Sequence, residues 1–162
     1  MIAGVSGHRD LGEAAAIAWV RGAIDVELQR HAVTHGMTSL AEGADQLFAQ
    51  LLASHGIPFD AVIPCDGYDE TFTTPSALAS FQDLLARASK IHRLPFVTPT
   101  EEAFLAAGKW IVNHCELLVA VWNGLPARGL GGTGDIVAYA QERNRRWIHL
   151  NPIDRSVAER TP

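Results

Sequence analysis

Short apolar runs alternate with amphipathic helical patterns along this chain, and few folds accommodate that alternation. The first run, 2–5, precedes a helical pattern in which Ile17, Val20, Ile24 and Leu28 recur every three or four residues. Strands that alternate with helices predict an α/β fold, here a three-layer, Rossmann-like fold with a mostly parallel sheet. Neither a repeat nor a linker interrupts the pattern, so we expect one domain over 1–162. Further strands are expected at 37–40, 59–64, 90–94, 116–122 and 147–150.

Capping patterns predict where two of the helices begin. Asp10 with Glu13 resembles a capping box at the start of the first helix. The segment 98–101, Thr-Pro-Thr-Glu, combines a capping threonine, a proline at the first helical position and a capping glutamate. It predicts a helix from Pro99 to about Asn113, and a last helix is expected at 133–145.

Composition narrows the class of partner. The chain has 13 Lys and Arg against 18 Asp and Glu, a net charge of −5, and no basic run, which makes nucleic acid an unlikely partner. Cys65 and Cys115 are far apart and fit buried free thiols in a reducing compartment. No apolar stretch is long enough to cross a bilayer and no signal peptide is present, so we expect a cytoplasmic protein without a membrane contact. Histidine spacing indicates no metal site, and no cofactor is expected.

Three polar segments that contain glycine follow predicted strands, at 6–10, 42–45 and 131–135. In an open parallel sheet, ligands bind outside the carboxyl ends of the strands, where helix N-termini point into a crevice. In the third segment, Gly131, Gly132 and Gly134 would let backbone amides approach a phosphate, and the hydroxyl of Thr133 would add a donor. Tight strand-to-helix connections need the same glycines, so a purely structural role stays open.

The first two segments add charged side chains. Arg9, beside Gly7, is suited to grip a phosphate or a carboxylate. His8 is either a general base or a solvated loop histidine. Glu42 and Asp45 are either acceptors for ribose hydroxyls or acidic residues that favour the first turn of the following helix.

These segments, taken in order, resemble the SLOG superfamily, which includes DprA, the YpsA-like proteins and the LOG phosphoribohydrolases. The run 39–46, Ser-Leu-Ala-Glu-Gly-Ala-Asp-Gln, is similar to the Ser-Gly-x-Ala-x-Gly-Ile-Asp segment of DprA. The helix end 109–113, the strand 116–122 and the Gly-Gly-Thr loop are similar to the elements that hold nucleotide phosphates in this superfamily. The resemblance covers Gly4 to Pro152 and implies a Rossmann-like, nucleotide-binding fold.

The sequence departs from the superfamily pattern at the positions that carry enzymatic activity in LOG proteins. LOG enzymes carry a catalytic glutamate after the glycine loop and an Arg-Lys pair on the preceding helix. Aligning the loops places Ala138 at the glutamate and Gly108-Lys109 at the pair. The chain also lacks the basic helix feature and the added DNA-binding domain of DprA, so the resemblance does not imply loading of single strands.

The sequence therefore predicts binding of a nucleotide or a nucleotide-derived metabolite, such as an adenylate or an ADP-ribose-like compound. One alternative is a nucleotide N-glycosidase that uses Glu42, Asp45 or Asp135; the other is a DprA-like scaffold that interacts with DNA. No catalytic residue is assigned, and a homodimer is expected from the resemblance and from the four tryptophans. The candidate binding residues are Gly7, His8, Arg9, Gly43, Asp45, Lys109, Gly131, Gly132, Thr133 and Gly134.

Overall fold

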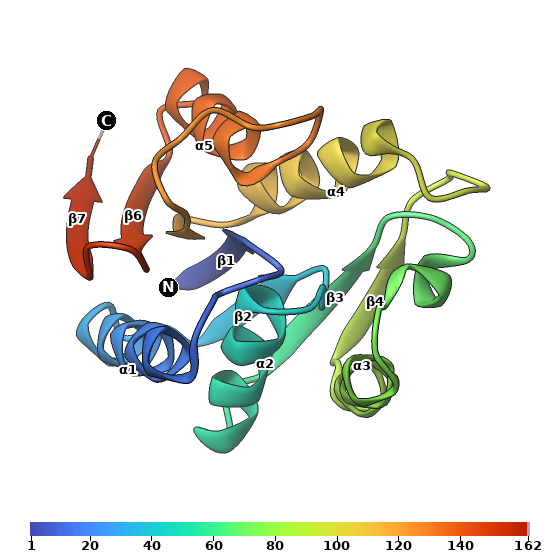
Figure 1. Ribbon diagram of the computed structural model, residues 1–162, viewed down its shortest axis with the longest axis horizontal. Helices are drawn as coiled ribbons and strands as arrows, with labels where there is room; N and C mark the ends of the chain where they lie inside the picture. The colour runs from blue at the N-terminus through green and yellow to red at the C-terminus, as the bar shows by residue number, and fades with distance from the viewer. Residues whose placement is uncertain (162) are drawn as a thin grey trace.

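A seven-stranded sheet lies between two layers of helices in the computed structural model, which describes residues 1–161 (Figure 1). Six strands are parallel, and the last runs antiparallel to its neighbour. The predicted three-layer, mostly parallel α/β fold is thus confirmed. The strands are β1 (Ile2–Gly7), β2 (His35–Thr38), β3 (Phe59–Ile63), β4 (Lys90–Arg93), β5 (Leu117–Val121), β6 (Arg146–Asn151) and β7 (Ser156–Arg160). The helices are α1 (Ala14–Arg30), α2 (Ala44–Ser54), the 3₁₀ turn η1 (Tyr68–Thr71), α3 (Pro75–Arg87), α4 (Glu101–His114) and α5 (Thr133–Glu142).

The strand order is β4-β3-β2-β1-β5-β6-β7, so the chain order reverses at the centre of the sheet. β1 pairs with β2 on one side and with β5 on the other. Figure 1 shows α1, α2 and α3 on one face and α4 and α5 on the opposite face. The connections that follow β1 and β5 therefore diverge, and this divergence opens a crevice at the carboxyl ends of both strands.

Two apolar clusters fill the spaces between the sheet and its helices. The cluster under α1, α2 and α3 includes Phe48 and Phe59, and the cluster under α4 and α5 includes Ile111 and Ile136. All five residues of β5 are buried, as expected for a central parallel strand covered on both faces. Both cysteines are buried and free. Within residues 1–161, no helix has the length and apolar character needed to span a bilayer.

Both predicted helix caps are wrong. The side chain of Glu13 makes no capping bond to α1, and the Asp10 carboxylate instead accepts the amide of Gly12 at 2.9 Å, in a turn before the helix. α4 begins after Thr100, whose hydroxyl accepts the Ala103 amide at 3.2 Å, so the proline lies outside the helix. In addition, α5 ends at Glu142 rather than 145, and β7 was not expected.

Candidate functional site

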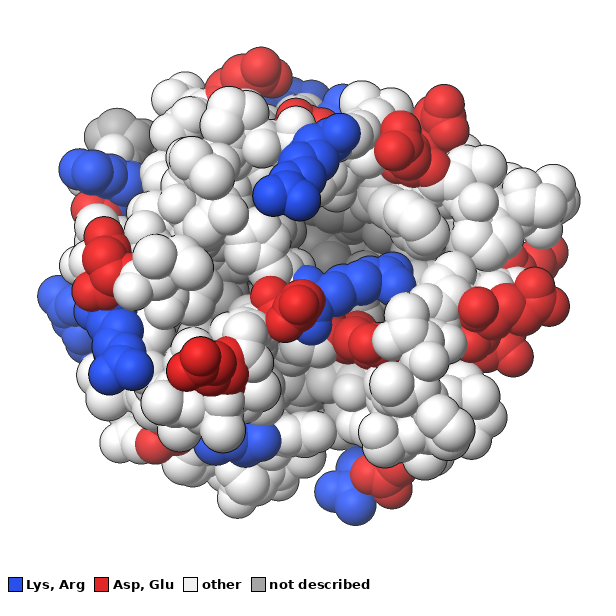
Figure 2. Space-filling view, in the orientation of Figure 1, with Lys and Arg blue, Asp and Glu red and all other residues white. Residues whose placement is uncertain are grey.

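A cleft of about 270 Å³ lies at the switch point between β1 and β5. Its volume is near the lower limit of small-ligand pockets, roughly 300 Å³. Figure 2 shows it as a hollow near the centre of this face. All three predicted segments contribute to its wall, together with side chains from η1 and α4. The lining residues that carry the argument are Ser6, Gly7, His8, Arg9, Ser39, Asp45, Tyr68, Phe104, Gly108, Gly131, Gly132 and Thr133.

The end of β1 is packed too tightly for a larger residue than glycine. A Cβ on Gly7 would lie 2.4 Å from the Cβ of Ala44 and 2.9 Å from the Cβ of Val121. These contacts come from the helix after β2 and from β5, on either side of the cleft. The small size of Gly7 is therefore required by packing, whether or not a ligand is present.

His8 joins the two halves of the site. Its amide donates to the carbonyl of Val121 at 3.1 Å, and its Nε2 accepts the amide of Asn123 at 3.2 Å. An accepting Nε2 carries no proton, so this contact needs the neutral ring with its proton on Nδ1. The ring thereby holds the connection after β5, rather than lying free in solvent.

Gly43 brings the second segment directly onto the first. Its φ is +80°, and a Cβ there would lie 2.4 Å from the carbonyl oxygen of His8 and 2.3 Å from that of Arg9. The amide of Ala44 also donates to the His8 carbonyl at 3.2 Å. Only glycine allows both this backbone conformation and this approach.

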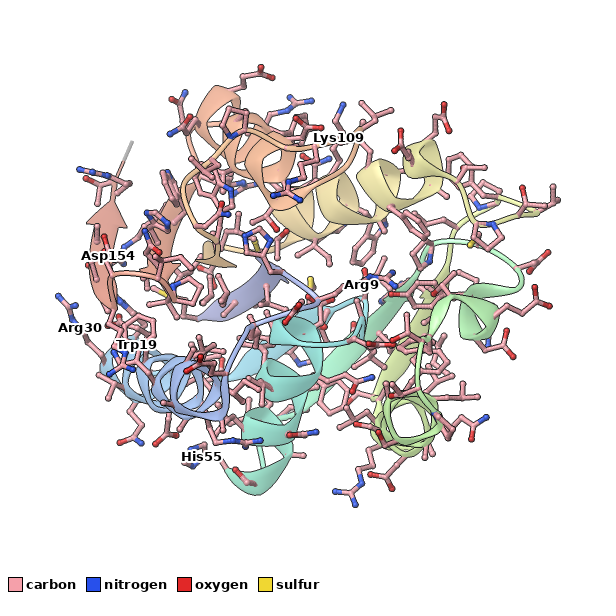
Figure 3. All side chains as sticks on the ribbon, viewed as in Figure 1. Arg9, Trp19, Arg30, His55, Lys109 and Asp154 are labelled. Atoms are coloured by element: carbon pink, nitrogen blue, oxygen red, sulfur yellow. The ribbon has the colours of Figure 1, made fainter. Side chains whose placement is uncertain are left out.

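Arg9 is the only Lys or Arg among the cleft-lining residues that the structure describes. Its guanidinium lies 5.7 Å from the ring centroid of Phe104, and its Nη1 donates to the Thr71 carbonyl at 3.3 Å. Figure 3 shows Arg9 reaching from the β1 end toward the middle of the molecule, where Figure 2 has a basic side chain on the rim of the hollow. The cleft thus offers one permanent positive charge to a ligand.

The two acidic residues of the second segment have different surroundings. Asp45 is buried and lines the cleft, and its Oδ2 accepts the amides of Ser39 at 3.1 Å and Ala41 at 3.4 Å. Burial raises the pKa of Asp45 to about 6, although these hydrogen bonds oppose the increase. Glu42 faces away from the cleft and binds the hydroxyl of Thr73 at 2.9 and 3.0 Å. Of these two carboxylates, only that of Asp45 is placed to meet a ligand in the cleft.

The raised pKa of Asp45 predicts an effect of pH on stability. Its pKa in an unfolded chain is about 3.9, so between pH 4 and 6 the folded state binds more protons than the unfolded state. The contribution of Asp45 to the free energy of unfolding therefore falls as pH rises, by about 3 kcal/mol in total and by about 2 kcal/mol between pH 4 and 7. Urea unfolding of the wild type and Asp45→Asn from pH 4 to 7 measures this fall as a difference. Parallel curves for the two proteins would contradict it.

The glycine loop ends at the first turn of α5, and its amides are not all equivalent. Gly131 donates its amide to the carboxylate of Asp135 at 2.9 Å, so that amide is already used. No acceptor within residues 1–161 pairs with the amides of Gly132 and Thr133, which begin the helix. Gly132 and Thr133 both line the cleft, at the positive end of α5. Gly134 lines a different cavity.

Lys109 does not reach the position predicted for it. Its Nζ lies 4.9 Å from the ring centroid of Tyr139, and the residue is not part of the cleft wall (Figure 3). Its neighbour Gly108 does line the cleft, and a Cβ on Gly108 would lie 2.3 Å from the Cδ1 of Ile136. α4 and α5 are therefore too close at Gly108 to admit an arginine without moving apart.

Tyr68 and Phe104 line the cleft but were missed in the sequence. Tyr68 is 3% exposed and packs edge-on against Phe72 and Phe81, and burial raises the pKa of its hydroxyl far above the ordinary value. Both residues look like ordinary core aromatics in the sequence. The position of Tyr68 just after β3 was the available clue, because it obeys the same strand-end rule as the three glycine segments.

Comparison with known proteins bears on the fold. No family model and no curated protein matches this sequence. Among solved structures, DprA from Streptococcus pneumoniae has a TM-score of 0.64 at 17% identity, covering 91% of this chain and 49% of that one. DprA from Helicobacter pylori, described in its single-stranded DNA binding mode, has a TM-score of 0.65 at 14% identity, covering 92% and 64%. The predicted resemblance to the SLOG superfamily is confirmed at the level of the fold.

A molybdenum cofactor binding protein from Rippkaea orientalis has a similar fold, with a TM-score of 0.59 at 14% identity, covering 93% of this chain and 76% of that one. This chain thus spans only half to two thirds of the two DprA chains but most of the cofactor-binding protein.

The structure also shows which side of α5 faces the cleft. Thr133 and Ile136 line it, whereas Ala138, aligned with the LOG glutamate, is exposed and lines another cavity. The Asp135 carboxylate is bound to the loop amide described above. Asp45 is consequently the only carboxylate-bearing residue in the cleft wall that the structure describes.

Proposed function

We propose that this chain binds a nucleotide or a nucleotide-derived metabolite of the adenylate or ADP-ribose type. The observation that carries the proposal is the convergence of three separate glycine segments on one cleft at the switch point of the sheet. A phosphate there would meet the guanidinium of Arg9 and the open amides of Gly132 and Thr133.

The rest of the wall fits the remainder of a nucleotide. Phe104 is partly exposed and gives the cleft an aromatic surface against which a base can pack. The hydroxyls of Ser6 and Ser39 and the carboxylate of Asp45 are polar groups within reach of a sugar. One cation and one carboxylate together favour a ligand with few phosphates over a highly charged chain.

AMP and ADP-ribose are expected to stabilise the fold in thermal unfolding. A ligand at one hundred times its Kd adds about 2.7 kcal/mol to the free energy of unfolding. Arg9→Gln is expected to weaken binding at least tenfold, because it removes the cleft's only guanidinium. Arg87→Gln is the matched control, since Arg87 is exposed on α3 and pairs with Asp83. The absence of a shift with AMP, ADP and ADP-ribose at millimolar concentration would rule out the proposal.

Single-stranded DNA is the second candidate ligand, because one protein with this fold is described in that binding mode. The net charge of −5 alone therefore does not support the exclusion of nucleic acid. Fluorescence anisotropy with a labelled oligodeoxythymidylate, competed by AMP, separates the two candidates. Self-association as a homodimer stays a prediction.

A further inference from the structure

A second cavity of about 330 Å³ lies among the start of α1, α2 and α3. Of the residues that line it, only Arg9 also lines the cleft. The nucleotide proposal leaves this cavity unexplained. Its wall combines an apolar side with several polar groups of α2 and α3.

Gln46 is the most informative residue of this wall. It is only 7% exposed, and its Nε2 donates to the carbonyl of Leu40 at 3.3 Å and to that of Ala77 at 3.0 Å. Because carbonyl oxygens only accept, these two bonds fix which end of the amide is nitrogen. The amide oxygen has no donor among residues 1–161 and is not sealed from solvent, so it stays open to a donor from a ligand. The cavity is where a ligand can supply that donor.

The charged groups around the cavity also favour a ligand that carries hydrogen-bond donors over a ligand that is an anion. Asp10 and Glu42 contribute two carboxylates against the one guanidinium of Arg9. Each carboxylate already accepts a hydrogen bond from the protein, from Gly12 and from Thr73. The carboxylates of Asp10 and Glu42 would repel a phosphate, whereas both can accept a hydrogen bond from a neutral N–H group.

The apolar side of the cavity is formed by Leu11, Ile17 and Leu47. Leu11 and Leu47 are buried, but Ile17 is 38% exposed although it belongs to the apolar stripe of α1. A flat ring placed here would cover Ile17 and remove apolar surface from water.

We propose that this cavity is a second binding site, for a small flat heterocycle that carries N–H donors, of the nucleobase class. A donor on the ring pairs with the amide oxygen of Gln46, and the ring packs against Leu11, Ile17 and Leu47. The site differs from the nucleotide cleft because it selects an uncharged base and excludes phosphate. The inference therefore stands whether or not the cleft binds a nucleotide.

Two matched probes test the hydrogen bond. 9-Methyladenine keeps the exocyclic amino donors, whereas 6-dimethylamino-9-methylpurine has no N–H group. Calorimetric titration of the intact chain is expected to show at least tenfold weaker binding of the second probe. Equal binding of the two probes would overturn the proposal.

Two matched variants test the location. Ala77→Leu fills the cavity and keeps the backbone carbonyl that holds Gln46, while Ala79→Leu makes the same change at an exposed position of α3 outside the wall. We expect at least a tenfold loss of 9-methyladenine binding in Ala77→Leu alone, with AMP binding unchanged in both variants. If Ala77→Leu does not fold, Ser80→Leu fills the same cavity from the next turn.

A third variant separates the two cavities. Thr133→Val alters the cleft and leaves the second cavity intact. Retention of 9-methyladenine binding in Thr133→Val supports the second site. If Thr133→Val loses 9-methyladenine binding while Ala77→Leu keeps it, the heterocycle binds in the cleft and the inference is overturned.

Discussion

Gly7→Ala is expected to lower the free energy of unfolding by about 3 kcal/mol or more. The new Cβ would lie 2.4 Å from the Cβ of Ala44, 2.9 Å from that of Val121 and 3.0 Å from the Val121 carbonyl oxygen. β1 is held between β2 and β5, so it has no free side toward which to move. Overpacking at a site that cannot relax costs about 1–3 kcal/mol or more. Urea unfolding with tryptophan fluorescence measures the change.

The same substitution at Gly22 is the control. Gly22 lies on the exposed side of α1, and a Cβ there has no atom within 4 Å. Alanine is a better helix former than glycine, so Gly22→Ala is expected to stabilise the fold by up to about 1 kcal/mol. Equal unfolding midpoints for the two variants would show that the packing argument at Gly7 is wrong.

No LOG-like phosphoribohydrolase activity on nucleoside monophosphates is expected. The position aligned with the LOG glutamate is Ala138, which faces away from the cleft, and the position aligned with the LOG arginine is Gly108. Loss of one well-placed acid–base or electrostatic group costs on the order of a hundredfold in rate, and two are missing. Chromatographic detection of free base, with heat-denatured protein as the blank, measures the rate.

Asp45 gives this expectation its sharpest test, because no other residue of the described cleft wall carries a carboxylate. If free base is released, Asp45→Asn decides whether that carboxylate is responsible. Turnover that Asp45→Asn abolishes, while AMP still binds, would establish the N-glycosidase alternative. Release that survives Asp45→Asn would point to a contaminating enzyme.

The order of strands and helices could be predicted from the sequence, but helix starts and the last strand could not. The run 98–101 offers two threonines, each followed by residues that suit a first turn, and sequence spacing does not decide between Thr98 and Thr100. Asp10 has a shorter-range partner in Gly12, and that turn competes with the capping box. β7 has little apolar alternation of its own and exists through pairing with β6.

The location of the candidate site could be predicted from the sequence, but the contacts of its individual side chains could not. Strand ends are visible in the sequence, so three loops could be assigned to one crevice. Side-chain direction depends on packing between distant helices, and this is why Lys109 turned out to face Tyr139 instead of the cleft. The carboxylates of Glu42 and Asp135 were likewise engaged by partners that sequence spacing does not reveal.

The central place of β1 affects how the chain folds as it is synthesised. β2, its partner on one side, follows after about thirty residues, but β5 on the other side begins only at Leu117. The β1–β4 half can therefore assemble first, with one edge of β1 unpaired until β5 leaves the ribosome. The contacts of Gly7 and His8 with Val121 form only when β5 pairs with this edge, so the cleft is completed in this late step. Ligand binding would therefore report the completed fold, and co-translational chaperones have an exposed strand edge to protect until then.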